Sequence, residues 1–357
     1  MGRLRLAMLA STAALALVAA TPLASTAAPA APAKAAGKYF ALEGSGSHLL
    51  FGAKKTSKTF TEADARGGAR QYVLNAKGQR TAVPADYDAY LVGDEPLFRK
   101  ETKAVDGLTD VHWIRPERGT SGTWTVPEGS EVVAPAPGGW IIQTPTEQGD
   151  YGRVSTLRRV LTDGTTTDLG TPSPEGKRYY VEAAPSGLLF ADETDGGDYA
   201  SLGTLQFMPW SKPGSYTQVY PATGTAAQVG ISIECGTGSS TLVRCIVGAD
   251  NDDPHTLLIP LDGSKSQPSL EKCSPYLNAA VRTFGIAWTD RTTANGCKAG
   301  RVEQRTTAGK LTVSTRRYYR LQDPVSAFGR LVVATSTQRH LVTISSPTST
   351  PKQIVGN

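Results

Sequence analysis

The most constraining feature of this 357-residue sequence is an internal repeat with an offset of 48 residues. The segment APAPGGWII at 134–142 is matched 48 residues later by Pro185, Gly187 and the apolar run at 188–190. The same offset then relates Gly149-Asp150-Tyr151 to Gly197-Asp198-Tyr199. Two separate matches at one offset are hard to obtain by chance, so we expect the chain to fold as a repeat protein.

Hairpin signals extend this repeat along the rest of the chain. Short β-prone runs flank turns at glycines that recur at intervals of 41 to 50 residues, namely Gly78, Gly119, Gly164, Gly214, Gly263 and Gly309. A seventh turn, without glycine, is expected near Pro347, and a second hairpin precedes several of these turns. Two hairpins per unit of about 45 residues match one four-stranded propeller blade. The prediction is an all-β β-propeller of seven four-stranded blades, with units starting near residues 38, 86, 129, 174, 223, 272 and 317.

The repeating unit also resembles that of known propellers. The segments APAPGGWII (134–142) and AAPSGLLFA (183–191) are similar to the Pro-x-Gly hairpins of TolB-like and WD40-like β-propellers. They lack the Asp-Gly turn and the Trp-Asp strand ending of those families, so the resemblance transfers no functional residue. Two alternatives stay open. One is a pair of packed β-sandwiches, and the other is a propeller whose last blade is completed by the strand near residues 39–42.

The N-terminal residues predict export. Arg3 and Arg5 precede an apolar stretch at 6–20, and small residues follow around 24–28, as in a secretory signal peptide. We expect a signal peptide over 1–27, an Ala/Pro-rich linker over 28–37 and the propeller over 38–357. The mature protein is then secreted, extracellular or cell-wall associated, with no transmembrane segment left after cleavage.

Export also directs the interpretation of the four cysteines, because disulfides persist outside the cytosol. Cys235 and Cys245 flank a short polar turn and are expected to pair across a hairpin, which leaves Cys273 to pair with Cys297. No Cys-x-x-Cys pair is present, so a zinc site is not predicted.

The charge balance argues against nucleic acid as a partner. The formal charge of +5 falls to +3 when the two leader arginines are removed. The pairs Arg158-Arg159 and Arg316-Arg317 are predicted to lie on solvated strand faces rather than to contact phosphates. The expected partner is an unidentified protein or glycan, and the protein is predicted to be a monomer.

Known catalytic motifs are missing from the sequence, which has no GxSxG elbow, no HExxH helix, no phosphate loop and no dinucleotide fingerprint. Gly44-Ser45-Gly46-Ser47-His48 places serines beside a histidine, and this segment is interpreted as a turn. The four histidines are His48, His112, His255 and His340; His112 and His340 are expected to pack in strands rather than to bind metal. No catalytic residue and no metal ligand are assigned.

Acidic residues collect in loops that follow the inner hairpins, and these loops are predicted to form a rim around one end of the propeller channel. The rim residues are Asp150, Tyr151, Asp192, Glu193, Asp195, Asp198, Tyr199, Asp250, Asp252 and Asp253. Solvated turns, a binding surface, a calcium site and catalytic carboxylates are the alternatives for this rim. Calcium is the single cofactor considered, and no cofactor is predicted.

The leading functional hypothesis is a secreted propeller that acts as a binding or scaffold module for a protein or glycan. The first alternative is an extracellular propeller hydrolase or lyase acting on a glycan or an ester, and the second is a structural component of the cell envelope. Fold alone does not choose between them. The enzyme hypothesis predicts two or three carboxylates close together in the centre of the ring, whereas the binding hypothesis predicts a flat, aromatic face.

Overall fold

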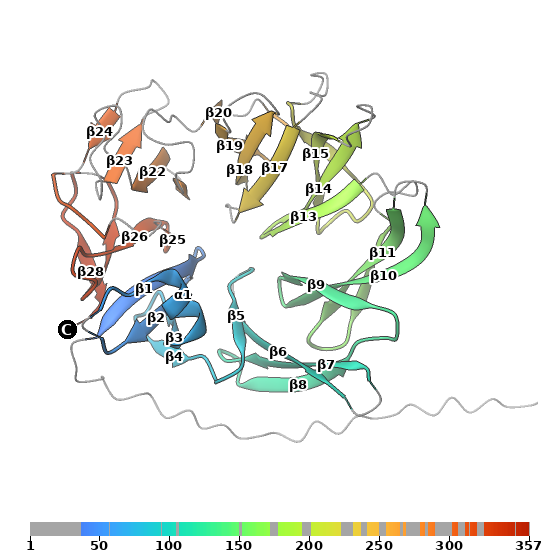
Figure 1. The fold of residues 1–357 in the computed structure, drawn as a ribbon, viewed down its shortest axis with the longest axis horizontal. Helices are drawn as coiled ribbons and strands as arrows, with labels where there is room; N and C mark the ends of the chain where they lie inside the picture. The colour runs from blue at the N-terminus through green and yellow to red at the C-terminus, as the bar shows by residue number, and fades with distance from the viewer. Residues whose placement is uncertain are drawn as a thin grey trace, which may run out of the picture.

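The computed structural model describes residues 37–56, 58–93, 95–104, 107–149, 152–171, 178–194, 201–222, 231–236, 241–249, 255–264, 267–268, 279–282, 285–289, 302–305, 311–313, 315–319, 325–346 and 348–356. Within these ranges the chain forms 28 β-strands and one short helix, α1 (Glu62–Gly67). Every strand pairing is antiparallel, and all but the pairing of β15 with β17 join strands that follow one another in sequence. Figure 1 shows the sheets as sectors of a ring, with β1, β5, β9 and β13 nearest its middle.

Five sheets contain four strands each. The first is formed by β1 (Lys38–Gly44), β2 (His48–Lys54), β3 (Arg70–Asn75) and β4 (Arg80–Ala82). The second is formed by β5 (Asp88–Tyr90), β6 (Leu97–Lys103), β7 (Thr109–Arg115) and β8 (Thr120–Thr125). The third is formed by β9 (Glu131–Ala136), β10 (Gly139–Gly149), β11 (Gly152–Leu161) and β12 (Thr166–Gly170). Two further sheets contain β21 (Ala279–Arg282), β22 (Gly285–Thr289), β23 (Val302–Arg305) and β24 (Leu311–Val313), and then β25 (Val325–Ala327), β26 (Arg330–Ala334), β27 (Leu341–Ile344) and β28 (Lys352–Val355).

The remaining strands form one eight-stranded sheet. Its first half contains β13 (Arg178–Ala184), β14 (Gly187–Thr194), β15 (Ser201–Pro209) and β16 (Thr217–Tyr220). Its second half contains β17 (Ile231–Gly236), β18 (Leu242–Ala249), β19 (His255–Pro260) and β20 (Gln267–Pro268). The halves are joined by one residue pair, Leu202 on β15 with Ile231 on β17. The all-β propeller prediction is confirmed, but the prediction of seven separate four-stranded blades is corrected, because this pairing merges eight strands into one sheet.

Glycines occupy the turns of the outer hairpins, as the repeat predicted. Gly78, Gly119, Gly164, Gly214 and Gly263 all adopt positive φ angles, between 63° and 86°, in the turns between third and fourth strands. Other residues rarely adopt this left-handed conformation. Gly309 lies outside the described residues.

The hydrophobic core lies between neighbouring sheets, because each sheet has two faces to bury. One cluster joins Phe40 and Leu50 of the first sheet to Phe98 of the second. Another joins Val111 of the second sheet to Trp140 of the third. The core is therefore divided among the joints of the ring, and the sectors depend on one another for burial.

The helix α1 covers the second strand of the first sheet. Thr61 and Asp64 form a reciprocal capping box at its start. Gly52 on β2 permits the close approach of the helix, since a Cβ added at Gly52 would lie 2.7 Å from the Cβ of Ala65. The one buried residue of α1 is thereby packed directly on the sheet.

The ring closes between the first and last sheets without a shared strand. β1 pairs with β2, and β28 pairs with β27, so β1 does not complete the last sheet in the described chain. Two backbone hydrogen bonds cross this seam, from Tyr39 N to Gln338 O at 2.8 Å and from Phe328 N to Ser45 O at 3.0 Å. A shared cluster that includes Phe51 and Leu341 fills the space between the two sheets. The alternative in which residues 39–42 complete the last blade is therefore wrong.

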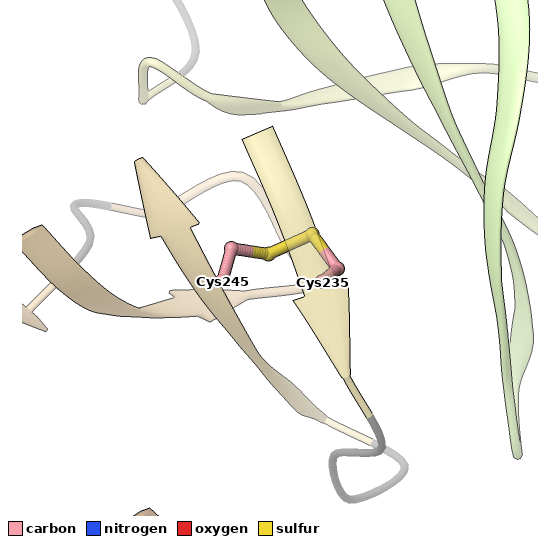
Figure 2. The surroundings of a disulfide bond; sticks show 2 residues. All are labelled: Cys235 and Cys245. Carbon is pink, nitrogen blue, oxygen red and sulfur yellow. A yellow bond between two sulfur atoms is a disulfide. The ribbon is translucent and has the colours of Figure 1, made fainter. Parts of the chain in front are cut away.

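One predicted disulfide is present. Cys235 on β17 and Cys245 on β18 are directly paired across the hairpin, with a Cα–Cα distance of 4.0 Å (Figure 2). Cys273 and Cys297 lie outside the described residues, as does the predicted signal peptide with nearly all of the linker. No helix of the described chain is long and apolar enough to span a bilayer.

Candidate acid–base site at the centre of the ring

Two inner strands carry a β-bulge at the same place, and each bulge is followed by a glutamate. In β1 the register shifts between Ala41 and Glu43, and Glu43 lies opposite Leu50. In β13 the register shifts between Tyr180 and Glu182, and Glu182 lies opposite Leu189. Bulges redirect side chains and are common beside functional sites. Figure 1 places β1 and β13 on opposite sides of the middle of the ring.

The surroundings of Glu43 favour its protonated form. Burial raises the pKa of this carboxyl, while a backbone hydrogen bond from Leu91 and the charge of Arg66 oppose the rise. The bond from Leu91 N to Glu43 Oε1 measures 3.3 Å and comes from the second sheet. The Glu43 side chain nevertheless stays partly exposed.

The pKa of Glu182 is raised as well. Burial raises its pKa from 4.5 to about 7, helped by the negative charge of Glu43 and opposed by a backbone hydrogen bond with Ala183. The two carboxyl groups are therefore near enough to interact electrostatically, although they belong to the first sheet and to the eight-stranded sheet. Glu182 is also partly exposed. A carboxyl with this pKa can give or take a proton near neutral pH.

The pair is not a general feature of the repeat. In the third sheet the residue that follows the equivalent bulge is Ala134, which lies opposite Ile141 and precedes Glu182 by the repeat offset of 48. Neither glutamate was among the residues singled out from the sequence, because acids were sought in polar loops. The sequence signal that could have revealed Glu182 is that it stands where the preceding repeat has the small residue Ala134, within an otherwise apolar segment.

Most residues of the predicted acidic rim lie outside the described residues, namely Asp150, Tyr151, Asp195, Asp198, Tyr199, Asp250, Asp252 and Asp253. Asp192 is described on β14, where its carboxylate accepts a hydrogen bond from Thr204 Oγ1 at 3.5 Å. Glu193 lies on the same strand and pairs with Leu202. The rim therefore stays a prediction, and the structure does not bring Asp192 into the pair formed by Glu43 and Glu182.

The Gly44–His48 segment is a turn, as expected, since Ser45 N donates to His48 O at 2.8 Å. The structure adds a contact that the sequence did not suggest. The His48 ring bonds Ser47 Oγ through Nδ1 and Glu117 Oε1 through Nε2, both at 2.8 Å. His48 is buried, with 3 % of its surface exposed. This line of three polar side chains joins the first sheet to the turn between β7 and β8 of the second.

The other described histidines lie apart. His112 bonds Thr102 and Thr123 on neighbouring strands of its own sheet, and His340 precedes β27 in the last sheet. The side chain of His255 lies outside what the structure describes. Among the described side chains, no group of three His, Cys, Asp or Glu residues is placed to hold a metal ion.

A second set of polar contacts joins neighbouring sectors on the hairpin turns. Glu95 accepts hydrogen bonds from Arg115 at 2.6 Å and from Arg118 at 2.8 Å, and these bonds lower the pKa of its carboxyl although burial opposes them. Arg115 also donates to Thr162 of the third sheet. Arg159, predicted to be solvated, instead lies partly buried over the ring of Trp210, 5.1 Å from its centre.

Comparison with known proteins supports the fold. The sequence matches no protein-family model and no curated protein. The structure is similar to a prolyl endopeptidase (TM-score 0.53, 11% identity, 88% of this chain and 48% of that chain). It is also similar to puromycin hydrolase (TM-score 0.51, 12% identity, 90% and 54%). A third similar structure is the β-propeller domain of the trilobed protease from Pyrococcus furiosus, described as having an open velcro topology (TM-score 0.50, 9% identity, 89% and 98%).

The chain thus spans about half the length of the prolyl endopeptidase and of puromycin hydrolase, and nearly all of the isolated propeller domain. At these identities the likeness establishes the fold alone. The ring of antiparallel sheets and the three similar structures together define the class of this protein: it is a β-propeller.

Proposed function

We propose that this β-propeller is a hydrolase or lyase whose acid–base pair is Glu43 and Glu182. The observation that carries the proposal is the pair of glutamates on equivalent bulges, with the pKa of both raised and that of Glu182 reaching about 7. Of the two substrate classes, a glycan fits better than an ester, because glycoside cleavage uses two carboxyl groups in different protonation states. In this scheme Glu182 gives its proton to the leaving oxygen as the glycosidic bond breaks. Glu43, in the fraction of molecules in which it is ionised, takes a proton from the water that attacks the sugar.

The similar structures support the hydrolase class over a binding scaffold, since they come from a prolyl endopeptidase, a puromycin hydrolase and a protease. The part matched in the last of these is itself a propeller domain. No residue role is carried over at 9% to 12% identity. The role of Glu182 rests on its own surroundings.

Three finer features belong to the same proposal. The sectors of the ring are built from TolB-like or WD40-like units. The leader over residues 1–27 is removed on export, which is compatible with the Cys235–Cys245 disulfide. The acidic loops, together with Asp192 on β14, form a rim that contacts the substrate on its way to the centre.

The test compares the mature chain with the variants Glu182→Gln and Glu131→Gln on a panel of polysaccharides, aryl glycosides and aryl esters. Glu131 is the matched control, because it is an exposed glutamate on another inner strand, β9. We expect glycan cleavage by the parent and by Glu131→Gln, a loss of at least 100-fold in Glu182→Gln, and a fall in parent activity above about pH 7. Saturable capture of a glycan without turnover would instead establish a binding module and overturn the enzymatic proposal.

A further inference from the structure

A pocket of about 650 Å³ lies in the last sector, away from the two glutamates. Four parts of the chain form it: the segment 315–319, the turn between β26 and β27, the strand β27, and the outer strand β28 with the residue before it. Its polar lining consists of Arg316, Arg317, Tyr318, Thr335, Ser336 and His340, together with Gln353, while Val342 and Pro351 add an apolar wall. Arg316 and Arg317 were predicted to lie on a strand face; they are exposed, but they lie outside any described strand and line this pocket.

The lining carries positive charge and hydrogen-bond donors. Two arginines, Arg316 and Arg317, line the pocket, and no carboxylate is among its described lining residues. Burial raises the pKa of the Tyr318 phenol, although the charge of Arg316 opposes this, so Tyr318 keeps its proton and can donate. The hydroxyl groups of Thr335 and Ser336 add two further donors.

The backbone that presents these groups is fixed. Tyr318 forms a bridge with Thr335, and Tyr319 N donates to Ala334 O at 3.1 Å. Thr335 N donates to His340 O at 2.9 Å, which closes the turn. Gly356 lies close to the His340 ring, since a Cβ added at Gly356 would clash with His340 Nδ1. The pocket is therefore a formed feature of the last sector.

We propose that this pocket binds the anionic group of a small organic ligand, a phosphate, sulfate or carboxylate carried on a body about the size of one sugar. Guanidinium groups bind such oxyanions through paired N–H donors. The volume exceeds the needs of a bare ion and falls within the range of small-molecule pockets. The site is distinct from the acid–base pair, and the inference does not depend on the proposed catalytic function.

The experiment measures binding of four sugars to the mature chain by isothermal titration calorimetry at low salt: glucose 6-phosphate, glucose 6-sulfate, glucuronate and glucose. Saturable binding of at least one anionic sugar, with none of glucose, is expected. The variant Arg317→Gln should weaken that binding by at least tenfold, since a hydrogen-bonded charge is lost. The control Arg80→Gln, an exposed arginine on β4 of the first sheet, should leave it unchanged.

The three anionic sugars also separate the sources of the charge, because the tightest of them identifies the ester or acid preferred. Circular dichroism of each variant verifies that the fold is kept. Absence of saturable binding to all three, or equal affinity in Arg317→Gln and Arg80→Gln, would overturn the proposal.

Discussion

Replacing Glu182 by glutamine should make the stability of this propeller less sensitive to pH. In the folded parent the pKa of Glu182 is about 7, against 4.5 for the free side chain. Below pH 4.5 the group is protonated in both the folded and the unfolded state, so its titration costs no stability. Between the two values the unfolded chain releases the proton and the folded chain keeps it, and the parent loses stability as the pH rises.

The size of this loss follows from the shift. A difference of about 2.5 in pKa corresponds to at most about 3 kcal/mol, reached above about pH 7. Glutamine keeps the shape of the side chain but does not titrate. Glu182→Gln should therefore match the parent near pH 4 and exceed its unfolding free energy by up to about 3 kcal/mol at pH 8.

The assay is urea unfolding of parent, Glu182→Gln and the control Glu131→Gln from pH 4 to pH 8. The control should follow the parent at every pH, because Glu131 is exposed on β9. In the variant Glu43→Gln the pKa of Glu182 should be lower than in the parent, because one cause of its rise is removed. The loss of stability with rising pH should therefore end at a lower pH. A stability difference between Glu182→Gln and parent that is constant over the whole range would refute the assignment.

Three further changes test the packing of the ring. Cys235→Ser opens a loop with a sequence separation of 10 and should lower the unfolding free energy by about 3 kcal/mol under oxidising conditions. Gly52→Val should cost about 1–3 kcal/mol in the same assay, because its side chain meets α1, whereas Gly46→Val has open space around it and should cost far less. His48→Ala should cost about 1–3 kcal/mol, because it leaves Glu117 without its buried partner.

Each of these has a result that would count against it. Equal stability of Cys235→Ser and parent would mean that the disulfide does not constrain the unfolded chain. Equal losses for the two glycine variants would mean that contact with α1 is not the cause. A His48→Ala variant as stable as the parent would show that the link between the first two sheets contributes nothing measurable.

Most of the fold could be predicted from the repeat, because residues close together in sequence determine where hairpins form. Gly164 and Gly214 could be placed in turns since positive φ angles favour glycine, and Cys235 with Cys245 flanked a visible turn. Whether two neighbouring sheets join could not be predicted, since it depends on the single pair Leu202–Ile231, which leaves no pattern in sequence.

The candidate site was harder to predict than the fold. Glu182 becomes important only because Glu43, far away in sequence, lies near it in space, and because burial acts on both. The contact of His48 with Glu117 has the same origin: a turn was predictable, but its partner on another sheet was not. Side chains that act together across a ring are brought together by closure, and a linear pattern does not record closure.

The seam between β1 and the last sheet has a consequence for how such a protein can change. No strand is exchanged there, so each hairpin pair of the described chain comes from one uninterrupted stretch of the gene. Duplication or deletion of a stretch that forms one of the five four-stranded sheets adds or removes a whole sector of the ring without dividing a sheet, and changes the circumference by that sector. For the same reason, we expect a circular permutant that opens the chain between β4 and β5 to keep every sheet intact, provided that a linker joins the old ends.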